Sequence, residues 1–577
     1  MAISKQKVRI GDLLVQNGVI TNEQLKTALE AQKEMGQKLG RVLVNLGFVE
    51  EDQFLSFLSQ QLQIPFIDLK RFQFDVNLIQ RLPENYARRH RAIVLQEKPH
   101  GLLVGMADPM DIFAFDEIER MLQTPIQQAV VRESELLNTL DLVYRRTEDI
   151  ATFAEELDEE LTEGQFDLES LTLDADDSEA PVVKLLQSIF EDAVQVRASD
   201  IHIEPDENVL RIRQRVDGVL QEQVMKERRI APALVLRLKL LASLDISEKR
   251  LPQDGRFSLK VKGRSIDVRL STMPIENGES VVMRLLDQTS GATNLEDVGM
   301  PAEMLENFRE LIHRPHGLIL VTGPTGSGKT TTLYGALQEL NTVGKKIITV
   351  EDPVEYRLHR VNQVQINPKI DLTFARVLRA ALRQDPDILL VGEIRDQETA
   401  EIALRAAMTG HMVLSTLHTN DAVSSAMRLV DMGAEGFLAA TALRAVIAQR
   451  LVRRLCDNCF VDHVPEAKDA AWIKGILGED EYSQMQLKQP AGCHRCNNTG
   501  YRGRVGVFEM LVMNESLSDA LRRENSSDFV KIAKRTAGYQ PLVISALKDA
   551  AKGITSLEEV LRVAEQIDES SDFMDVA

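Results

Sequence analysis

Leu318-Ile-Leu-Val-Thr-Gly-Pro-Thr-Gly-Ser-Gly-Lys-Thr330 is the segment that decides the fold of this chain. Its last eight residues fit the phosphate-loop pattern G-x-x-x-x-G-K-[ST] at every fixed position. The apolar run before the loop predicts a buried strand, and the residues after it contain no helix breaker. Because strand, glycine loop and helix are the context that this motif needs, a chance glycine turn is disfavoured and the sequence predicts an α/β nucleotide-binding core.

The residues of the loop have separate predicted roles. Glycines let backbone N–H groups curl around phosphate oxygens, and the helix N-terminus adds a positive dipole end. Lys329 can reach the β and γ phosphates, and the Thr330 hydroxyl can hold Mg²⁺. The residues expected to contact ATP are Gly323, Pro324, Thr325, Gly326, Ser327, Gly328, Lys329, Thr330 and Thr331.

Length and charge bound the kind of protein. A chain of 577 residues should form several domains, about four by length alone. The net charge is −20, but residues 148–179 contain fourteen acidic side chains and no Lys or Arg, so the remainder is only mildly acidic. A large basic field for nucleic acid is absent, which disfavours a DNA-tracking motor. The sequence has neither a signal peptide nor an apolar run of membrane-spanning length, so we expect a cytoplasmic protein that meets membranes only through partners.

A tandem repeat occupies the start of the chain. The segment Arg9–Gly18 is echoed further along the chain by Lys38–Gly47. Apolar spacings of three and four within each copy predict short helices. The two copies should pack on each other, because neither buries its apolar face alone.

The whole chain is predicted to divide into eight segments. Short alternating runs such as Ser265–Leu270 predict strands, and the acidic stretch predicts a flexible linker. The segments are 1–68, the helical repeat; 69–147, a small α/β part of the same N-terminal domain; 148–180, the acidic linker; 181–290, a second small α/β domain; 291–451, the nucleotide-binding core; 452–510, a four-cysteine module; 511–566, C-terminal helices; and 567–577, an acidic tail.

Two predicted strands of the core end in carboxylates. Ile347–Val350 is followed by Glu351, and Ile388–Val391 is followed two residues later by Glu393. In open α/β sheets ligands bind beyond the carboxyl ends of the strands. Hydrolysis needs one carboxylate near the metal and another that orients water, and we assign Glu393 and Glu351 to these roles. The alternative is that both are exposed loop acids or helix caps.

Two histidines and several arginines are further candidates. His411 precedes the predicted strand Met412–Leu417 and His418 follows it, and either could donate to the γ-phosphate, although a single histidine is usually structural. A site that closes between subunits also needs arginines to neutralise charge on the γ-phosphate. The arginine candidates are Arg213, Arg256 and Arg269, and for any one of them a salt-bridged sheet face is the better interpretation.

All four cysteines occur as two Cys-x-x-Cys pairs, Cys456/Cys459 and Cys493/Cys496. Each pair can hold one side of a tetrahedral Zn²⁺. Disulfides are disfavoured in a cytosolic chain, and a redox motif would need only one pair. We therefore predict a structural zinc site, with His494 a less favoured ligand.

The motifs together resemble the ATPases of the type II secretion and type IV pilus superfamily. The matching pieces are Ala198–Glu204, Arg215–Val219, Pro252–Arg256, the phosphate loop, Val350–Glu355, Gly392–Asp396, and Thr409–His411 through Ser415–Thr419. The resemblance implies a RecA-like core preceded by a small α/β, PAS-like domain. It places Glu351 in the Asp box, Glu393 in Walker B, and both histidines in the His box.

The resemblance also implies an activity and partners. Members hydrolyse ATP with Mg²⁺ as ring hexamers whose sites are completed by arginines from the domain before the core. They act on an inner-membrane platform protein to assemble a pilus or pseudopilus, and the four-cysteine zinc module marks the assembly branch.

The N-terminal repeat resembles the cyclic-di-GMP-binding domains of mannose-sensitive haemagglutinin pilus ATPases. Arg9 would pair with a guanine edge, leucines would pack on the guanine faces, and backbone N–H groups beside the glycines would meet phosphates. Lys38 cannot copy the planar fork of Arg9, so the two half-sites should be unequal. The expected contact residues are Arg9, Ile10, Gly11, Leu25, Leu29, Gln32, Lys38, Leu39, Gly40, Phe54, Leu58, Gln61 and Asp108.

Three functions therefore remain open. The leading hypothesis is an ATP-driven motor for pilus extension that cyclic-di-GMP regulates. The second is a type II secretion ATPase whose repeat docks a membrane-anchored partner, with its leucines in the core. The third is a nucleotide-gated scaffold with little turnover, which intact Lys329, Glu351 and Glu393 disfavour.

Overall fold

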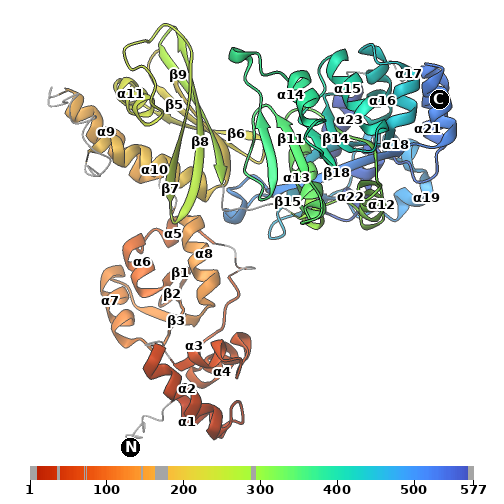
Figure 1. Ribbon diagram of the computed structural model, residues 1–577. Coiled ribbons are helices and arrows are strands. Elements are labelled where there is room, and N and C mark those ends of the chain that lie inside the picture. The colour runs from red at the N-terminus through yellow and green to blue at the C-terminus, as the bar shows by residue number, and fades with distance from the viewer. Residues whose placement is uncertain are drawn as a thin grey trace, which may run out of the picture. The chain divides into compact units, whose positions relative to one another are not determined.

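A computed structural model describes residues 10–35, 39–69, 72, 74–144, 147–162, 180–287 and 294–568 (Figure 1). The chain forms two compact units, of which the first holds residues 1–146 and the second holds nearly all of residues 147–577. Within the described residues, no helix combines the length and the apolar character that crossing a membrane requires.

The predicted tandem repeat is confirmed as two copies of a helix pair. The helices are α1 (Ile10–Gln16), α2 (Asn22–Met35), α3 (Leu39–Asn45) and α4 (Glu51–Leu62), and both helices of the second copy begin at positions equivalent to those of the first. The turns match as well, because Gly18 and Gly47 have φ of 70° and 68°. Leu14 and Val42 are among the fully buried side chains of one core that both copies share.

The rest of the first unit is a small α/β fold. Its three-stranded sheet pairs β1 with β2 antiparallel and β2 with β3 parallel. A segment after α4 joins this sheet, since Ile67 N–H donates to the Val130 carbonyl at 2.9 Å. The elements are α5 (Val76–Ile79), α6 (Glu84–His90), β1 (Ala92–Lys98), β2 (Gly101–Met106), α7 (Ile112–Leu122), β3 (Ile126–Val130) and α8 (Glu133–Val143).

The predicted flexible linker over 148–180 is wrong for its first half. Helix α9 spans Thr147–Thr162 and packs on the next helix through Ile150, Ala154 and Leu157, which are all buried. These apolar residues recur at intervals of four and three, the period of one helix face. The density of acidic residues on the other positions concealed that period, and residues 163–179 lie outside the described part of the chain.

The small domain after α9 is an antiparallel sheet with helices packed on it. The six strands have the order β6-β5-β4-β9-β8-β7, and the core lies between the sheet and helices α9, α10 and α11 (Figure 1). The elements are α10 (Pro181–Gln195), β4 (Ala198–Pro205), β5 (Leu210–Val216), β6 (Val219–Met225), η2 (Arg228–Ile230), α11 (Ala231–Leu241), β7 (Gln253–Val261), β8 (Arg264–Ile275) and β9 (Gly278–Asp287).

The nucleotide-binding core is built on a seven-stranded sheet of order β12-β11-β13-β14-β10-β15-β18. All neighbours pair in parallel except β15 and β18, which are antiparallel. Hydrophobic clusters pack on the sheet, with helices on both sides, as for a buried parallel sheet (Figure 1). The elements up to the last parallel strand are η3 (Leu295–Val298), α12 (Ala302–Ile312), β10 (Gly317–Thr322), α13 (Lys329–Leu340), β11 (Ile347–Glu351), β12 (Val361–Gln365), η4 (Pro368–Ile370), α14 (Phe374–Ala381), β13 (Ile388–Val391), α15 (Gln397–Met408), β14 (Met412–Leu417), α16 (Ala422–Asp431), α17 (Gly436–Ala442) and β15 (Leu443–Leu455).

The predicted limits of the four-cysteine module, 452 and 510, both fall inside strands of the core sheet. Strand β15 continues to Leu455, and β18 (Tyr501–Val512) returns along it as the edge strand. The sequence signal was ambiguous because charged side chains interrupt both strands. The elements between these strands are β16 (Val461–Asp462), α18 (Ala467–Leu477), α19 (Glu479–Ser483), β17 (Lys488–Gln489) and η5 (His494–Cys496).

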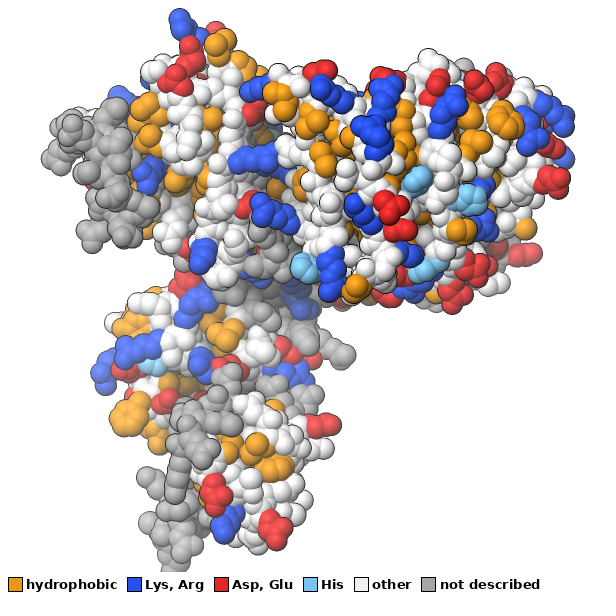
Figure 2. Space-filling view, in the orientation of Figure 1, with side chains coloured by type: hydrophobic (Ala, Val, Ile, Leu, Met, Phe, Trp, Pro, Cys, Tyr) orange, Lys and Arg blue, Asp and Glu red, His pale blue; other side chains and the backbone are white. Residues whose placement is uncertain are grey.

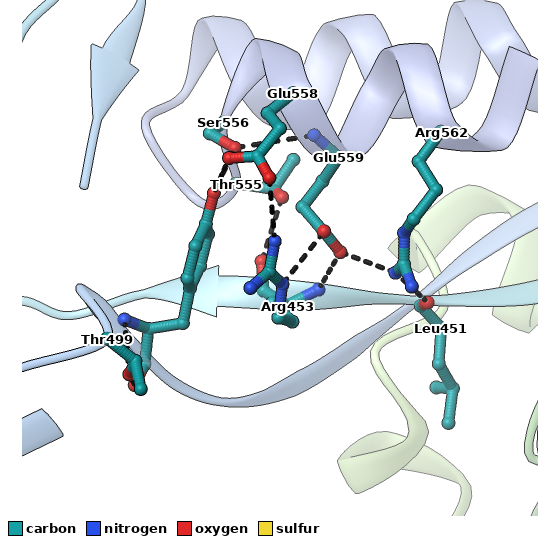
Figure 3. A network of polar contacts seen from close by, with 9 residues as sticks. Leu451, Arg453, Thr499, Thr555, Ser556, Glu558, Glu559 and Arg562 are labelled. Carbon is teal, nitrogen blue, oxygen red and sulfur yellow. Dashed lines mark hydrogen bonds and ion pairs between the residues drawn. The ribbon is translucent and has the colours of Figure 1, made fainter. Parts of the chain in front are cut away.

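The last of the C-terminal helices is fastened to strand β15 by the buried Arg453–Glu559 ion pair. Glu559 is fully buried and accepts from the Arg453 guanidinium at 2.8 Å, and Arg562 also donates to it at 2.6 Å. Figure 3 shows Glu558 and Glu559 of the helix reaching Arg453 of the strand, while Arg562 pairs with Glu559 within the helix. Such pairs are costly to break, because one charge would be left buried alone. The helices are α20 (Glu515–Arg522), α21 (Ser526–Arg535), α22 (Leu542–Ala551) and α23 (Leu557–Asp568).

Charged side chains of both signs are exposed on the second unit. On the face shown in Figure 2, basic and acidic groups are interspersed over residues 147–577. The strong net acidity of the chain comes largely from residues 148–179, a segment whose sequence contains fourteen acidic residues and no Lys or Arg.

Candidate functional site

The phosphate loop joins the central strand β10 to the N-terminus of α13. Gly323, Gly326 and Gly328 have φ of 145°, 81° and 88°, which side chains rarely tolerate. A Cβ on Gly323 would lie 2.4 Å from the Gln449 carbonyl oxygen, so strand β15 packs directly under the loop. The glycines therefore serve both the curl of the loop and its close packing on the sheet.

Lys329 lies within the curl of the loop. Its Nζ donates to the carbonyls of Gly323 at 2.7 Å and Pro324 at 3.0 Å, and the residue is only 8% exposed. Burial lowers the pKa of Lys329 to about 8, against a smaller raising effect of Glu393. The Thr330 side chain is exposed at the helix start, where a hydroxyl can reach a metal ion bound beside phosphates.

Glu393 and His418 come together beyond the carboxyl ends of neighbouring strands. The His418 Nε2 lies 3.2 Å from a carboxylate oxygen of Glu393, and Arg395 pairs with the other oxygen. Glu393 also raises the pKa of Lys329 through its charge, which places it near the phosphate loop. This acid therefore lies near the phosphate loop, and its assignment to the metal side of the site stays a prediction.

Glu351 is not an exposed loop acid. It is 4% exposed, and its carboxylate accepts hydrogen bonds from Tyr334, from Thr349 at 2.5 Å and from Gln363 at 3.2 Å. The residue ends β11, which is separated from β10 by β13 and β14 in the sheet. The carboxylate is thus fixed in a polar cluster at the carboxyl edge of the sheet.

The prediction that His411 belongs to the nucleotide site is wrong, because His411 lies at the end of the sheet away from the phosphate loop. His411 precedes β14 at its amino end, and its carbonyl accepts from Gly317 N–H, at the start of β10. The phosphate loop follows the other end of β10, about 20 Å away over six residues. The ring Nδ1 of His411 instead lies 3.0 Å from the Ala406 carbonyl, as expected of a structural histidine.

The three arginine candidates lie in different surroundings. Arg269 contacts the core, binding the Glu355 carboxylate at 2.9 Å and the Val354 carbonyl at 3.0 Å. Arg213 pairs with Glu204 at 2.6 Å on its own sheet, which is the salt-bridged arrangement expected for a structural arginine. Arg256 lines a cavity of about 360 Å³ in the small domain; its other lining residues are Asp200, Asp254, Gly255, Arg269, Leu270, Ser271, Val282 and Arg284.

Three residues around the loop were missed by the sequence reasoning. Gln449 accepts from the Thr332 hydroxyl at 2.7 Å, Arg450 donates to the Asn420 carbonyl at 2.8 Å, and Tyr334 binds Glu351. Gln449 and Arg450 are 1% and 2% exposed. A polar pair inside the apolar run 445–452 was the available signal, because polar groups are buried only where they have partners.

The four cysteines come together as the spacing predicted. Their Sγ atoms all lie within 4.8 Å of one another, and those of Cys459 and Cys496 are 3.7 Å apart. Thiolates at about 2.3 Å from a tetrahedral Zn²⁺ would lie about 3.8 Å from each other, so the cluster fits one zinc ion. With four thiolates the shell would be closed, which is typical of a structural site.

The first copy of the N-terminal repeat has mixed surroundings. Leu29 is 42% exposed and open to a ligand, whereas Leu25 is buried in the shared core. A Cβ on Gly11 would lie 2.6 Å from the Leu25 side chain, so close helix packing explains this glycine. Gln32 and Leu39 are half-buried. Arg9 and Lys38 lie outside the described residues, as do the side chain of Ile10 and the surroundings of Gly40.

The second copy does not repeat the exposure of the first. Leu58, the counterpart of Leu29, is 6% exposed and packs in a cluster with Val130 from β3. The α/β part of the unit thus covers Leu58, and its assignment to a guanine face stays a prediction. Phe54 is partly buried and packs against both the shared core of the repeat and the cluster that contains Leu58 and Val130. Gln61 is exposed.

Asp108 lies in the turn between β2 and α7. Its carboxylate accepts from the Met110 backbone N–H at 3.1 Å, as in a turn that an aspartate stabilises locally. That contact gives Asp108 a structural role without a ligand, so its assignment to a guanine edge stays a prediction.

Comparison with known families decides what kind of core this is. The family described as type II/IV secretion system protein matches residues 175–562.

The chain belongs to the type II/IV secretion system protein family.

This secretion-family protein is therefore an ATP-hydrolysing enzyme, and the family implies ATP and Mg²⁺ at the phosphate loop. A second family model, the MshEN domain, matches residues 62–150, nearly all of which belong to the first unit.

Relatives from both branches of the superfamily align with this ATPase. A type IV pilus assembly ATPase, PilB, of Myxococcus xanthus (strain DK1622) is 41% identical over 96% of this chain and 98% of its own. A type II secretion system ATPase E of Vibrio cholerae serotype O1 is 43% identical over 85% of this chain and 97% of its own. The type II secretion system protein E of Klebsiella pneumoniae is 45% identical over 84% and 97%.

Solved structures resemble separate parts of this ATPase. The pilus retraction motor PilT with bound ADP is 28% identical and covers 66% of this chain and 96% of its own, with a TM-score of 0.45. A structure of MshE with cdg is 40% identical and covers 24% of this chain and 100% of its own, with a TM-score of 0.23.

Removing the loop lysine should abolish turnover. Lys329→Ala deletes the one side-chain cation that the loop motif brings to the γ-phosphate, whereas Glu393→Ala keeps the cradle and should bind ATP while kcat falls about 10²–10³-fold. Steady-state ATPase rates and nucleotide titrations measure both effects. The exposed Glu398→Ala, a little further along the same segment, is the control. Wild-type turnover in Lys329→Ala or Glu393→Ala would refute the assignment.

Nucleotide affinity should fall at alkaline pH. Because burial lowers the pKa of Lys329 to about 8, the free protein loses the ammonium proton as pH rises through that value. Phosphate oxygens favour the protonated form, so binding must restore the proton. We expect Kd for Mg-ADP to be nearly constant below pH ~7 and to rise about tenfold per pH unit above ~8.5. Calorimetric titrations in buffers of different ionisation enthalpy would detect the proton uptake; its absence, with a flat Kd, would contradict the prediction.

The cysteine cluster should contain metal. Elemental analysis of the purified protein is expected to find about one zinc per chain. Cys456→Ser and Cys493→Ser should each lose the zinc and lower Tm, because the closed shell stabilises the loops between β15 and β18. A folded, active protein without zinc would show that the cluster has another role.

Proposed function

We propose that this ATPase is the motor for extension of a type IV pilus of the mannose-sensitive haemagglutinin kind. One observation carries the choice: the pilus assembly ATPase aligns with 96% of the chain, whereas the secretion ATPases align with 84–85%. The added coverage means that the pilus relative shares more of the sequence outside the catalytic core. The motor would act in the cytoplasm as a ring hexamer, at an inner-membrane platform protein.

The catalytic cycle would use the groups at the carboxyl edge of the core sheet. The loop N–H groups and Lys329 would hold the β and γ phosphates, and Thr330 with Glu393 would hold Mg²⁺. The metal, when bound, neutralises charge on the phosphates. His418, which contacts Glu393, would be placed to donate to the γ-phosphate, and Glu351 would orient the attacking water.

An arginine from the small domain would complete the site. Arg269 is the best placed of the candidates, because it already contacts the loop that follows Glu351. Its ion pair with Glu355 would have to open before the guanidinium could turn to a phosphate. Arg256, in the cavity beside it, would be the second. This exchange of partners would tie rotation of the small domain to the nucleotide state.

The N-terminal unit would bind cyclic-di-GMP and regulate the motor. Support comes from the MshEN match over residues 62–150 and from a repeat that resembles the cyclic-di-GMP-binding domains of such pilus ATPases. The repeat presents two matched helix pairs in tandem, which suits a nearly two-fold symmetric ligand. The exposed Leu29 offers apolar surface in the first half-site only, since Leu58 is buried.

A type II secretion ATPase is the second candidate. It is favoured by the higher identities of the secretion relatives, 43–45% against 41% for the pilus relative. In that case the N-terminal unit would dock a membrane-anchored partner and would have no need of Arg9 or of an exposed Leu29.

Cyclic-di-GMP titration separates these two candidates. The full chain should bind the dinucleotide, Arg9→Ala should raise Kd at least tenfold by removing the guanine-edge fork, and Leu29→Ala should raise it about threefold or more without lowering Tm. Lys26→Ala, an exposed change on the same repeat, is the control for loss of one positive charge.

Calorimetry measures the binding, and ATPase rates with and without the dinucleotide measure the regulation. Unchanged binding after both Arg9→Ala and Leu29→Ala, or no binding by the folded wild-type protein, would exclude this assignment and favour the docking role.

A further inference from the structure

The Glu351 carboxylate is held by donors from three separate elements. Tyr334 reaches it from α13, Thr349 from its own strand at 2.5 Å, and Gln363 from β12 at 3.2 Å. Three hydrogen bonds leave a carboxylate little freedom to turn, and burial makes each of them stronger than it would be in water. The position of this acid is therefore set by its neighbours.

Tyr334 is the donor that connects Glu351 to the nucleotide loop. It follows Lys329 in the same helix, so hydrogen bonding along α13 fixes its distance from the helix N-terminus. Its ring is fully buried and meets the Tyr356 ring edge-on, with centroids 4.6 Å apart. Phenylalanine would fill the same space, so packing alone does not call for a hydroxyl at this position.

The Tyr334 hydroxyl is also a point where the following loop meets the helix. The backbone N–H of Glu355 and the side-chain amide of Gln363 both approach its oxygen at 3.4 Å. Burial, with the neighbouring Glu351 charge, raises the pKa of Tyr334, so the hydroxyl keeps its proton and remains a donor. One oxygen thus joins α13, the end of β11 and the loop that contains Glu355.

We propose that Tyr334 is a positioning residue for ATP hydrolysis, which holds the Glu351 carboxylate at a fixed place relative to the phosphate-loop helix. The proposal rests on the proposed role of Glu351 in orienting water. Because Lys329 and Tyr334 belong to one helix, a phosphate bound at its N-terminus and the carboxylate beside Tyr334 share one rigid frame. Thr349 and Gln363 then fix the remaining freedom of the carboxylate.

The test is Tyr334→Phe in the full-length protein. Losing the hydroxyl frees Glu351 to shift while the cradle for the phosphates is unchanged. We expect kcat to fall about 10–100-fold, as for a misplacement of about 1 Å, with KM for ATP within about twofold of wild type. Tyr356→Phe, which removes a hydroxyl from the other ring of the same pair, is the matched control and should keep kcat.

A double-mutant cycle separates positioning from general damage. If Tyr334 acts only through Glu351, the variant Tyr334→Phe/Glu351→Gln should be no slower than Glu351→Gln alone. Additive losses, a kcat unchanged by Tyr334→Phe, or a matching rise in KM would each overturn the proposal while leaving the role of Glu351 intact. Wild-type turnover in Glu351→Gln would refute that role and the proposal with it.

Discussion

The packing of strand β15 under the phosphate loop is the constraint on which the catalytic end of this ATPase depends. The Gln449 carbonyl oxygen lies 2.4 Å from the place of a Cβ on Gly323, and the Gln449 side-chain amide lies 2.8 Å from the place of a Cβ on Gly328. The backbone carbonyl and the side-chain amide of Gln449 thus limit the space that the loop can occupy on the side of the sheet. The parallel pairing of β10 with β14 and β15 then fixes where these two neighbouring strands lie relative to the phosphate loop.

Local patterns in the sequence were sufficient to predict the helices and strands of the core. They were insufficient to predict which residues contact one another across the fold. Strands ending at Thr322, Glu351 and Val391 follow from apolar runs beside a recognisable loop. His411 was misplaced because membership of the His box was given more weight than its position before the strand, at the end away from the ligand edge; the parallel register confirms that position. The burial of Leu58 was also beyond local patterns, since it depends on Val130, which is distant in the sequence.

The polar groups around the site show the same limit. Nothing in the local sequence marks Tyr334 as a partner of Glu351, because the contact joins a helix to a strand that follows it after a loop. The cysteine pairs are the opposite case: their spacing alone predicted the cluster, since tetrahedral thiolate coordination constrains pairs of residues so closely. A site can be predicted from the sequence when its chemistry requires particular residues at fixed spacings along the chain.

Strand β15 has a mechanical consequence for the motor. Gln449 and Arg450 lie beneath the nucleotide loop, Arg453 is clamped to α23, and the strand ends immediately before Cys456. From Arg450 to Cys456 the chain is extended over about 20 Å, with β18 paired along it. A paired strand resists bending far more than a loop does. One continuous stretch of chain, interrupted in its register only between Arg453 and Leu455, therefore connects the floor of the phosphate loop to the first cysteine of the cluster.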